Sequence, residues 1–235
     1  MLQLNMQPPE KPVMQEDGSL EVHSVFLTVQ GEGPFTGCAS IFIRLAGCNL
    51  ECASCDTDYT SRRELLTPRQ IMAHVKLLCP ERIPVLFVLT GGEPFRQNIG
   101  PLIEFLLMRS LQVQIETNGT LWPKSLDYHD DLFIVCSPKT PNIHPNIARN
   151  ATVFKYVLDA EHVDPNDGLP TESVGSRYRP YRPWASRVVI PEIYVQTLAE
   201  QDRLKNKRNL EACIEACLKY DYRLSCQLHK IIGVE

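Results

Sequence analysis

The sequence lacks the features of membrane, secreted and nucleic-acid-coating proteins. No apolar run approaches the roughly 20 residues that a bilayer-spanning helix needs. Basic residues are not in excess, since 24 Lys and Arg stand against 28 Asp and Glu for a formal net charge of −4, whereas proteins that coat nucleic acid carry a basic surplus. Residues 1–20 are polar and contain prolines, without the basic and apolar segments of a signal peptide. We therefore expect a soluble, cytoplasmic protein with no membrane and no nucleic-acid partner.

The chain is long enough for one domain with a sizeable core, since 43% of its 235 residues are hydrophobic. We expect a flexible amino-terminal arm over residues 1–20, which packs late or not at all, and a single domain over residues 21–235. Within that domain, residues 164–187 are polar and broken by prolines, and structureless loops of this length are usually functional or disordered. We expect residues 164–187 to form a lid, a subunit contact or a disordered surface loop.

Strand-like and helix-like segments alternate along the chain, which predicts parallel strands joined by right-handed helical crossovers. Several strand candidates are apolar throughout, as expected for strands buried on both faces. Strand candidates outnumber clear helices, so we predict an α/β fold with a partial, TIM-like barrel that does not close. The strand candidates are Ser40–Ala46, Val85–Thr90, Gln112–Glu116, Leu132–Cys136, Val153–Leu158, Val188–Val195 and Arg223–Leu228. The helix candidates are Pro68–Leu78, which Thr67 caps, Asn98–Met108 and Leu198–Tyr220.

Cysteine is the anomaly in this composition. Nine cysteines are present, and an odd number without a secretory signal does not indicate a disulfide framework. Cys48, Cys52 and Cys55 lie within eight residues, directly after a strand candidate. Three thiolates with this spacing can bind three corners of an iron–sulfur cubane, which leaves the fourth iron open to chelate a small molecule.

Two weaker interpretations of these cysteines stay open. A structural zinc site needs four closed ligands, commonly as two separated pairs. The other cysteine pair, Cys213 and Cys217, lies far along the chain, and its spacing of four residues fits packing on one face of a helix. A zinc-binding module without catalysis is therefore one alternative, and a chance group of buried cysteines is the other.

A glycine-rich turn strengthens the cluster interpretation. Thr90-Gly91-Gly92-Glu93-Pro94 follows an apolar strand candidate. Glycines allow a ligand to approach the backbone closely, and backbone carbonyls or the Glu93 carboxylate can receive an ammonium group. Together with the three cysteines, this turn resembles the radical S-adenosylmethionine (SAM) superfamily. In that superfamily the open iron of a [4Fe–4S] cluster binds SAM, and one-electron reduction gives a 5′-deoxyadenosyl radical that abstracts hydrogen.

Further strings narrow the resemblance. They are VQGEG (29–33), GCNL (47–50), CDT (55–57), TGGEP (90–94), ETNGT (116–120), SPK (137–139) and QLHK (227–230). Together they resemble one family, the 7-carboxy-7-deazaguanine synthases of 7-deazapurine (queuosine-type) biosynthesis, and the resemblance covers most of residues 22–232. It implies a lyase that converts 6-carboxy-5,6,7,8-tetrahydropterin into 7-carboxy-7-deazaguanine and releases ammonia.

The resemblance also implies which residues form the site. The substrate residues are Val29, Gln30, Gly31, Glu32, Arg44, Thr90 and His229. The SAM residues are Ser54, Asp56, Gly92, Glu93, Ser137, Pro138, Lys139 and Gln196. Cys48, Cys52 and Cys55 hold the cluster, and Thr57 holds a magnesium ion. Two roles stay open: Glu32 binds the substrate or is salt-bridged within the protein, and His229 touches the substrate from the last strand or pairs within the core.

The family further implies a pterin substrate, a homodimer and an electron donor such as flavodoxin or ferredoxin. One rival within the superfamily stays open, an activating enzyme that makes a glycyl radical on a partner protein, because small enzymes of that kind share the cysteine spacing. The VQGEG and CDT strings favour the pterin enzyme.

Overall fold

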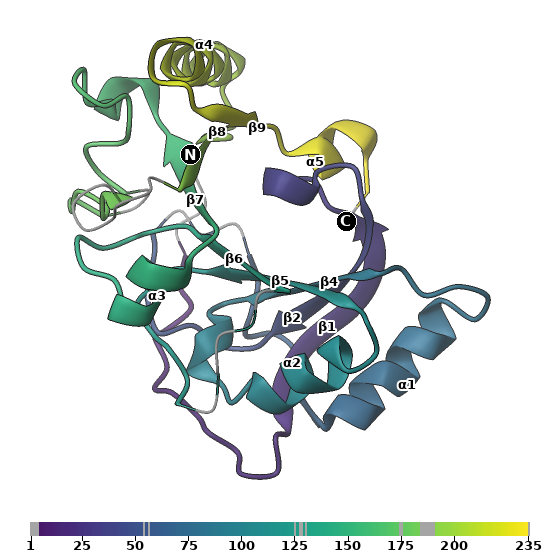
Figure 1. Ribbon diagram of the computed structural model, residues 1–235. Coiled ribbons are helices and arrows are strands. Elements are labelled where there is room, and N and C mark those ends of the chain that lie inside the picture. Colours follow the sequence, from purple (N-terminus) through teal and green to yellow (C-terminus); the bar gives the residue numbers. More distant parts are fainter. Residues whose placement is uncertain are drawn as a thin grey trace.

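A computed structural model of the chain describes residues 5–53, 55, 57–124, 126, 129, 131–173, 176–183 and 191–234. The described residues form one curved sheet of nine strands in the order β3-β1-β2-β4-β5-β6-β7-β8-β9, which leaves an open barrel (Figure 1). The strands are β1 (Leu20–Val29), β2 (Ala39–Leu45), β3 (Glu64–Leu66), β4 (Leu86–Gly91), β5 (Gln112–Thr117), β6 (Leu132–Cys136), β7 (Val153–Leu158), β8 (Glu192–Thr197) and β9 (Arg223–Ser225).

Helices cover the outer face of this sheet. In Figure 1, α1, α2 and α3 lie on one side of the strands β1 to β6, and α4 lies outside the far end of the sheet, where it packs against β7 and β8. None of the helices in the described ranges is long and apolar enough to cross a bilayer. The helices are α1 (Pro68–Leu78), α2 (Gly100–Leu107), α3 (Pro145–Asn150), α4 (Arg203–Tyr220) and α5 (Leu228–Ile232). The 3₁₀ turns are η1 (Gly33–Phe35), η2 (Pro94–Arg96) and η3 (Ala160–His162).

The predicted partial TIM-like barrel is confirmed. From β2 to β9, every pair of neighbouring strands is parallel. The sequence analysis missed β1 and β3, which run antiparallel at one edge of the sheet. Their signal is weak because Glu21 and His23 interrupt the apolar residues at the start of β1, and β3 has only three residues.

The two faces of the sheet differ in chemistry, which the prediction of strands buried on both faces did not anticipate. Successive side chains of a strand point to opposite faces. In β2, Ile41 and Ile43 are fully buried against the helices, whereas Arg44 lines the inner cavity. In the same way Glu116 of β5 and Lys155 of β7 line the cavity, whereas their neighbours Ile115, Phe154 and Tyr156 belong to the hydrophobic core. The outer face therefore supplies the hydrophobic core, and the inner face supplies polar groups.

Side-chain hydrogen bonds fix where two of the helices begin. The predicted cap of α1 is confirmed, since the Thr67 hydroxyl accepts from the Gln70 N–H and the Gln70 side chain accepts from the Thr67 N–H. Helix α4 begins at Arg203, later than predicted, because the Asp202 carboxylate caps it. The last strand ends at Ser225, so the prediction that His229 extends from this strand is wrong: His229 lies in α5.

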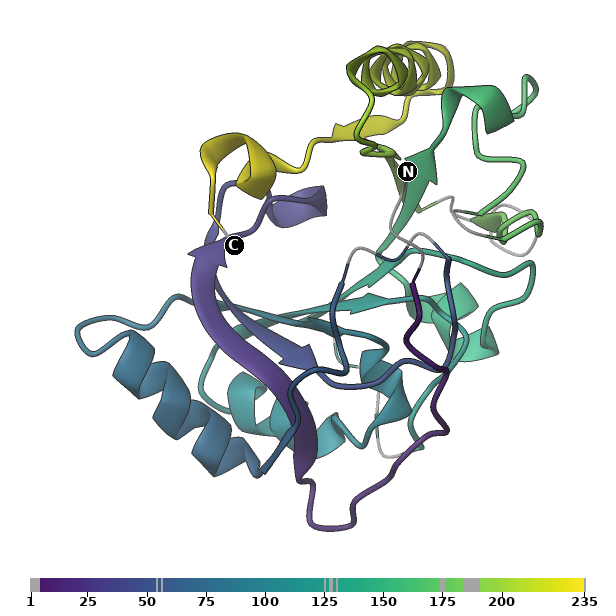
Figure 2. The same cartoon turned by 180° about the vertical axis from the view of Figure 1, so that it is seen from behind.

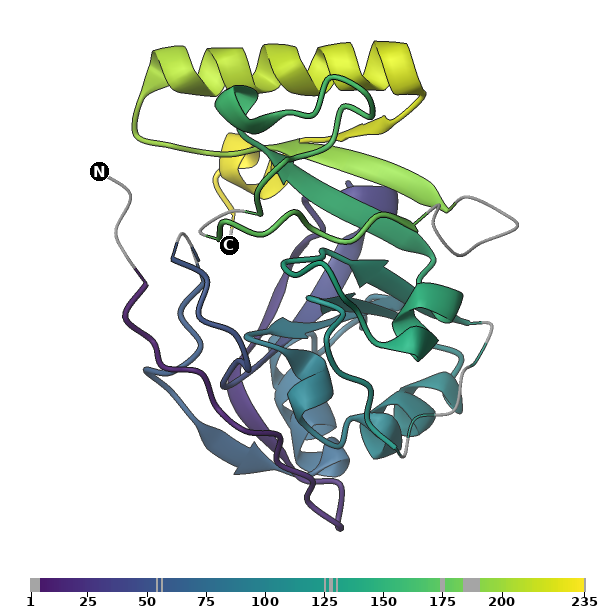
Figure 3. The same ribbon diagram turned by 90° about the vertical axis from the view of Figure 1, so that its left-hand side faces the viewer.

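The amino-terminal arm differs from the expectation that it packs late or not at all. Residues 5–19 lie along the loop between β2 and β3, as the dark purple and blue segments show in Figures 2 and 3. The Glu10 N–H donates to the carbonyl of Cys48 at 2.7 Å, and Val13 forms a parallel bridge with Gln97. The arm is therefore hydrogen-bonded to the segment that carries the three cysteines.

The described part of segment 164–187 is held by ion pairs within the loop. Arg179 pairs with Asp164 at 2.7 Å, and Arg182 pairs with Asp167 at 2.8 Å. The Tyr222 hydroxyl donates to the backbone carbonyl of Asp167, which ties the loop to the segment after α4. Residues 184–187 of the predicted loop lie outside the described residues.

Candidate active site

A cavity of about 450 Å³ opens on the inner face of the sheet. It lies at the carboxyl ends of the parallel strands, where α/β barrels and sheets bind their ligands. Gly31, Glu93 and Pro138 lie behind its surface, and Ser54 and Asp56 lie outside the described residues. The predicted site residues that line it are Val29, Gln30, Glu32, Arg44, Cys48, Cys52, Cys55, Thr57, Thr90, Gly92, Ser137, Lys139, Gln196 and His229.

The three cysteines of the triad line one end of this cavity. They lie on the loop after β2, which the structure describes through Ala53, at Cys55 and again from Thr57. Burial, together with nearby anions, raises the pKa of the Cys48 thiol to about 12. A thiolate at this position therefore needs a bound cation to be stable, and metal ligation supplies one.

The spacing of these thiols bears on the zinc alternative. Within the described ranges, no group of three or more His, Cys, Asp or Glu side chains is arranged to hold a single metal ion. In a cubane each thiolate binds a different iron, so the three sulfurs need not converge on one point. Three cysteines around one cavity fit a cluster, and the zinc-binding module gains no support.

The glycine-rich turn packs directly on the cysteine loop. A Cβ atom on Gly92 would lie 2.1 Å from the Gly47 carbonyl oxygen and 2.8 Å from the Cys48 Cβ. Gly91 has φ +136, a backbone conformation that residues with a side chain rarely adopt. Only glycine therefore allows the turn after β4 to approach the cysteine loop this closely, and Gly92 lines the cavity beside the cysteines.

Glu93 does not have the role that the resemblance implies for its side chain. The residue is fully buried, and its carboxylate accepts hydrogen bonds from the Thr117 hydroxyl and the Asn118 N–H, both at 2.7 Å. Burial raises its pKa to about 7, in spite of these hydrogen bonds. Its carboxylate fastens the turn to the end of β5, which leaves backbone carbonyls of the turn as the groups that can receive an ammonium.

A cation faces the cysteine end of the cavity from the turn after β6. Lys139 Nζ donates to the Ser137 hydroxyl at 2.7 Å, and both residues line the cavity. Burial lowers the pKa of Lys139, while the thiol of Cys52 acts in the opposite direction. Lys139 is thus close enough to the cysteines to interact electrostatically with them, and it suits an anionic group bound nearby.

Glu32 is salt-bridged within the protein, which is one of its two open roles, and it also lines the cavity. Its carboxylate pairs with Lys155 of β7, and it also accepts from Gln227 at 2.9 Å and from Gln196 at 3.3 Å. Burial alone would raise the pKa of Glu32, but the charge of Lys155 outweighs burial and holds the pKa well below its usual range. Gln196, which the resemblance implies for SAM, lines the cavity and is hydrogen-bonded to Glu32.

A second carboxylate, Glu116 of β5, organises the neighbouring part of the cavity. It accepts hydrogen bonds from Gln30 at 3.2 Å, from Gln114 at 3.1 Å and from the Thr90 hydroxyl at 3.1 Å. Two of these bonds reach Oε1 and one reaches Oε2. An ionised carboxylate has about four acceptor positions, so Oε2 keeps one for a ligand.

Arg44 of β2 provides a cationic group over an aromatic wall. Its guanidinium lies 5.3 Å from the ring centroid of Phe26, which stacks on Phe42 at 5.3 Å. Among the described residues the guanidinium has no carboxylate partner, and its buried Nε has no hydrogen-bond acceptor. All three side chains line the cavity. This corner can hold a flat ring and a carboxylate together.

Gly31 packs directly against His229. A Cβ atom on Gly31 would lie 2.0 Å from His229 Nδ1, and the Gly31 carbonyl accepts from the Leu228 N–H at 3.0 Å. The resemblance implies a backbone contact from Gly31 to the substrate. The structure instead shows that a glycine here makes room for α5, which brings His229 to the cavity.

Two functional side chains were missed by sequence reasoning, Lys155 and Glu116. Lys155 lies in the otherwise apolar segment VFKYVL, and a single lysine in a buried strand is a signal that we could have used. Glu116 begins the ETNGT string, where no role was assigned to it. The pairing of Lys155 with Glu32 joins residues 123 positions apart, so it needs the fold.

Comparison with known proteins identifies the family. A sequence model described as the radical SAM superfamily matches residues 42–160. A curated 7-carboxy-7-deazaguanine synthase of Rhodospirillum rubrum is 44% identical over 97% of this chain and 97% of its own length. The chain belongs to the 7-carboxy-7-deazaguanine synthase family of the radical SAM superfamily. The curated synthase of Rickettsia prowazekii is 38% identical, over 97% of this chain and 94% of that protein.

The fold agrees with this family. The crystal structure of QueE from Escherichia coli superposes with a TM-score of 0.66, covering 90% of this chain and 98% of that one at 20% identity. Membership of the radical SAM superfamily implies a [4Fe–4S] cluster and SAM. The residues present fit both groups, because three cysteines, the Gly92 turn and Lys139 face the same end of the cavity.

Proposed function

We propose that the protein converts 6-carboxy-5,6,7,8-tetrahydropterin into 7-carboxy-7-deazaguanine with release of ammonia, the reaction that the family resemblance implies. The observation that carries the proposal is the position of Arg44. Its guanidinium lies in the same cavity as the three cysteines, beside two aromatic rings and without a protein carboxylate among the described residues. A flat ring that bears a carboxylate complements this arrangement.

The polar groups around Arg44 suit the rest of a pterin. Glu116 retains an acceptor position on Oε2 beside Thr90, which matches an N–H of a guanidine-like ring edge. The Glu32–Lys155 pair keeps both charges fixed by mutual contact, with Gln196 and Gln227 completing the carboxylate's hydrogen bonds. These groups are held before a ligand arrives, which reduces the ordering cost of binding.

At the other end of the cavity, Cys48, Cys52 and Cys55 would hold the cluster. The bound cluster and SAM supply the radical that abstracts hydrogen from the substrate, and the protein supplies position and exclusion of water. Gly92 would allow close approach of SAM to the backbone, and Lys139 would neutralise its carboxylate. The substrate end and the cluster end share one cavity, so the two reactants would meet without a change of fold.

We also propose a magnesium ion bound by Thr57, which lines the same cavity as the cysteines and Arg44. Magnesium takes few protein ligands and completes its shell with water and substrate oxygens, so a single hydroxyl is sufficient. From the family resemblance alone we further propose a homodimer in the cytoplasm and a one-electron donor such as flavodoxin or ferredoxin.

The test is a direct assay under anaerobic conditions. Protein with a reconstituted cluster is incubated with the pterin, SAM, dithionite and magnesium, and the products are analysed by mass spectrometry. We expect 7-carboxy-7-deazaguanine in the complete mixture and none without SAM. An Arg44→Met variant with an intact cluster is the matched control, and we expect it to cleave SAM but to form little product.

Two results would contradict the proposal. If SAM is cleaved to 5′-deoxyadenosine but no deazaguanine forms, the radical chemistry stands and the substrate is wrong, as for an enzyme that activates a partner protein. If Arg44→Met forms product as fast as the wild type at low pterin concentration, the proposed substrate corner is wrong.

A further inference from the structure

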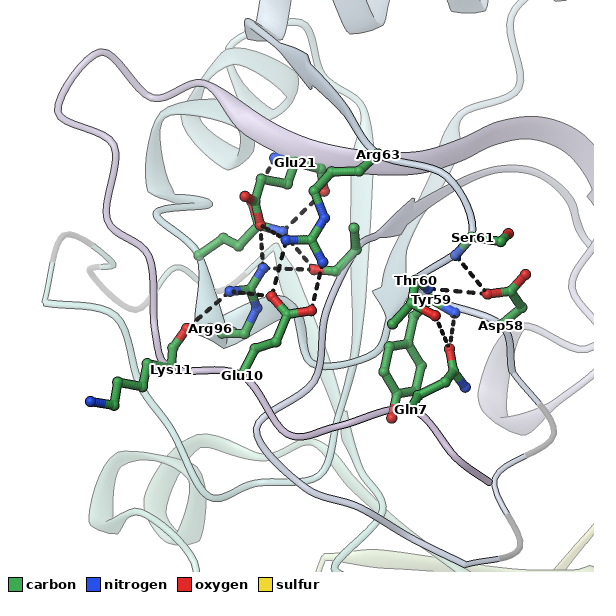
Figure 4. Close-up of polar contacts among 12 residues, drawn as sticks. Gln7, Glu10, Lys11, Glu21, Asp58, Tyr59, Thr60, Ser61, Arg63 and Arg96 are labelled. Carbon is green, nitrogen blue, oxygen red and sulfur yellow. Dashed lines mark hydrogen bonds and ion pairs between the residues drawn. The ribbon is translucent and has the colours of Figure 1, made fainter. Parts of the chain in front are cut away.

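The amino-terminal arm contacts the cysteine loop through its backbone and through the side chain of Gln7. Gln7 Nε2 donates to the Thr57 carbonyl at 2.9 Å, and the Tyr59 N–H donates to Gln7 Oε1 at 2.9 Å. Figure 4 shows the Gln7 side chain directed at Tyr59 and Thr60 of the loop. The Thr60 hydroxyl donates to the same oxygen at 3.0 Å.

This contact imitates a neighbouring β-strand. A strand would satisfy one carbonyl and one N–H two residues apart, and the primary amide of Gln7 does so with a single side chain. A side-chain primary amide offers a neutral donor and a neutral acceptor on two neighbouring atoms. Replacing Gln7 by Glu would keep the acceptor and place a carboxylate oxygen against the Thr57 carbonyl, where a donor is needed.

The arm is fixed at a second point, three residues further on. Glu10 forms a two-bond ion pair with Arg63, at 2.6 and 3.0 Å, and lies 3.4 Å from Arg96 (Figure 4). The Arg96 side chain is fully buried and donates to the Lys11 carbonyl at 2.9 Å. Because Arg96 also donates to the Ala46 carbonyl, it joins the arm to the start of the cysteine loop.

The chain between these two points is stiff. Pro8 and Pro9 separate Gln7 from Glu10, and each proline fixes its own φ and lacks an N–H that could form other hydrogen bonds. Consecutive prolines favour the extended polyproline conformation. The anchored Glu10 therefore sets where Gln7 lies, and little conformational freedom is lost when Gln7 binds the loop.

Gln7 acts on the part of the loop that carries functional groups. The Thr57 carbonyl that it binds lies 3.8 Å from the Cys55 sulfur, and Asn5 supports the same loop by donating its N–H to the Ala53 carbonyl at 2.9 Å. We propose that Gln7 is a positioning residue for the described residues Cys55 and 57–59, and that it keeps Cys55 in place for the cluster and Thr57 in place for the magnesium ion. The part concerning magnesium rests on the proposed function.

The test compares three single variants of the full-length, cluster-loaded protein. Gln7→Met keeps the size of the side chain and removes its hydrogen bonds to Thr57, Tyr59 and Thr60, and Gln7→Glu keeps only the acceptor. Met6→Ala is the matched control, because the Met6 side chain is 84% exposed on the same arm. Iron loss to a ferrous chelator is followed anaerobically, together with the EPR signal of the reduced cluster before and after SAM is added.

We expect iron loss to be about tenfold faster in both Gln7 variants, since more than one hydrogen bond to the loop is lost or opposed. Their EPR change on adding SAM should differ from the wild type, whereas Met6→Ala should match it. The magnesium concentration for half-maximal activity should rise in the Gln7 variants. A Pro8→Gly, Pro9→Gly double variant, which leaves Gln7 intact, should lose iron at an intermediate rate.

Wild-type iron loss and EPR spectra in both Gln7 variants would overturn the proposal, and so would wild-type behaviour of Gln7→Glu alone. Equal acceleration in Met6→Ala would show that the arm acts as a general cover and would also overturn the role of Gln7. Iron loss and EPR need neither pterin nor magnesium, so they report on Gln7 even if the wild type forms no deazaguanine.

Discussion

The two ends of the cavity are built in different ways. At the pterin end, Arg44, Thr90, Glu116 and Lys155 project from the parallel strands β2, β4, β5 and β7. At the cluster end, the cysteines lie on a loop whose described residues between β2 and β3 form neither helix nor strand. The first end is positioned by the hydrogen-bond ladder of the sheet, and the second by side chains that reach the loop from elsewhere.

Because the two ends are built differently, substitutions at one end should affect substrate binding, and substitutions at the other should affect retention of the cluster. A residue on a strand keeps its backbone position when its side chain changes, so substitutions at the pterin end should alter substrate kinetics and leave the cluster spectrum unchanged. The loop depends on the thiolate–iron bonds themselves and on contacts such as those of Gln7 and Asn49, whose side-chain amide donates to the Thr120 hydroxyl at 2.8 Å. Substitutions there should alter the cluster first and activity as a consequence.

The largest effect is expected for Cys52→Ala, which removes one of the three thiolates. A cubane held by two thiolates is not retained, so product formation should fall below detection, at least about a thousandfold, because the chemistry is supplied by the cofactor. Iron content and visible absorbance measure the loss. Cys217→Ala on α4 is the matched control and should keep its cluster; a brown, active Cys52→Ala protein would refute the assignment of this thiol.

The next largest effect is expected for Lys155→Met at the pterin end. It leaves Glu32 buried without its cation, which should cost about 3 kcal/mol of unfolding free energy and lower kcat/KM by roughly a hundredfold. Thermal unfolding and steady-state kinetics measure the two losses, while the cluster spectrum stays that of the wild type. Adding Glu32→Gln should recover much of the stability but not the activity. If Lys155→Met lost its cluster, the two ends of the cavity would not be independent of each other.

A smaller effect is expected for Arg44→Gln. Because the guanidinium has no carboxylate partner among the described residues, its removal should change the free energy of unfolding by less than about 1 kcal/mol. Loss of a charge-assisted pair with the substrate should raise the pterin KM roughly tenfold to a hundredfold. Initial rates over a range of pterin concentrations give this value, and an unchanged KM would place the substrate carboxylate elsewhere.

The smallest effect on activity is expected at Glu93, whose buried side chain does not line the cavity. Burial raises its pKa to about 7, above the ordinary 4.5. A group with a raised pKa in the folded state stabilises the fold below its unfolded pKa, and this stabilisation is lost as pH rises toward 7. The protein without its cluster should therefore lose on the order of 2 kcal/mol of unfolding free energy between pH 5 and pH 8. Glu93→Gln should show a flatter profile in denaturant titrations, and equal slopes would refute the raised pKa.

Much of the strand pattern could be predicted from the sequence because the outer face of the barrel is apolar. Runs such as Leu132–Cys136 and Val153–Leu158 bury their outward residues against helices and carry a clear signal. Strand β1 carries a weaker one, since polar residues alternate irregularly along it. The cysteine triad and the TGGEP turn were found because their chemistry depends on local spacing.

The rest of the site depends on contacts that spacing along the chain does not encode. The partner of Glu32 lies 123 residues away, and the hydrogen bonds of Gln7 reach a loop about 50 residues further on. Glu93 is a motif residue that we expected to face a ligand. It is fully buried, and its carboxylate accepts hydrogen bonds from backbone N–H groups instead. Motifs thus identify which residue types are needed, and the fold decides where each side chain points.

Helix α5 forms one wall of the cavity and comes last among the described elements. Gln227 and His229 line the cavity, and Leu228 binds the carbonyl of Gly31. All other described elements precede these residues in the sequence. During translation, therefore, the sheet and the cysteine loop are synthesised while this side of the cavity is still open. The strands that carry Arg44, Glu116 and Lys155 are thus synthesised before α5, and α5 is the last element to be added to the wall of the cavity.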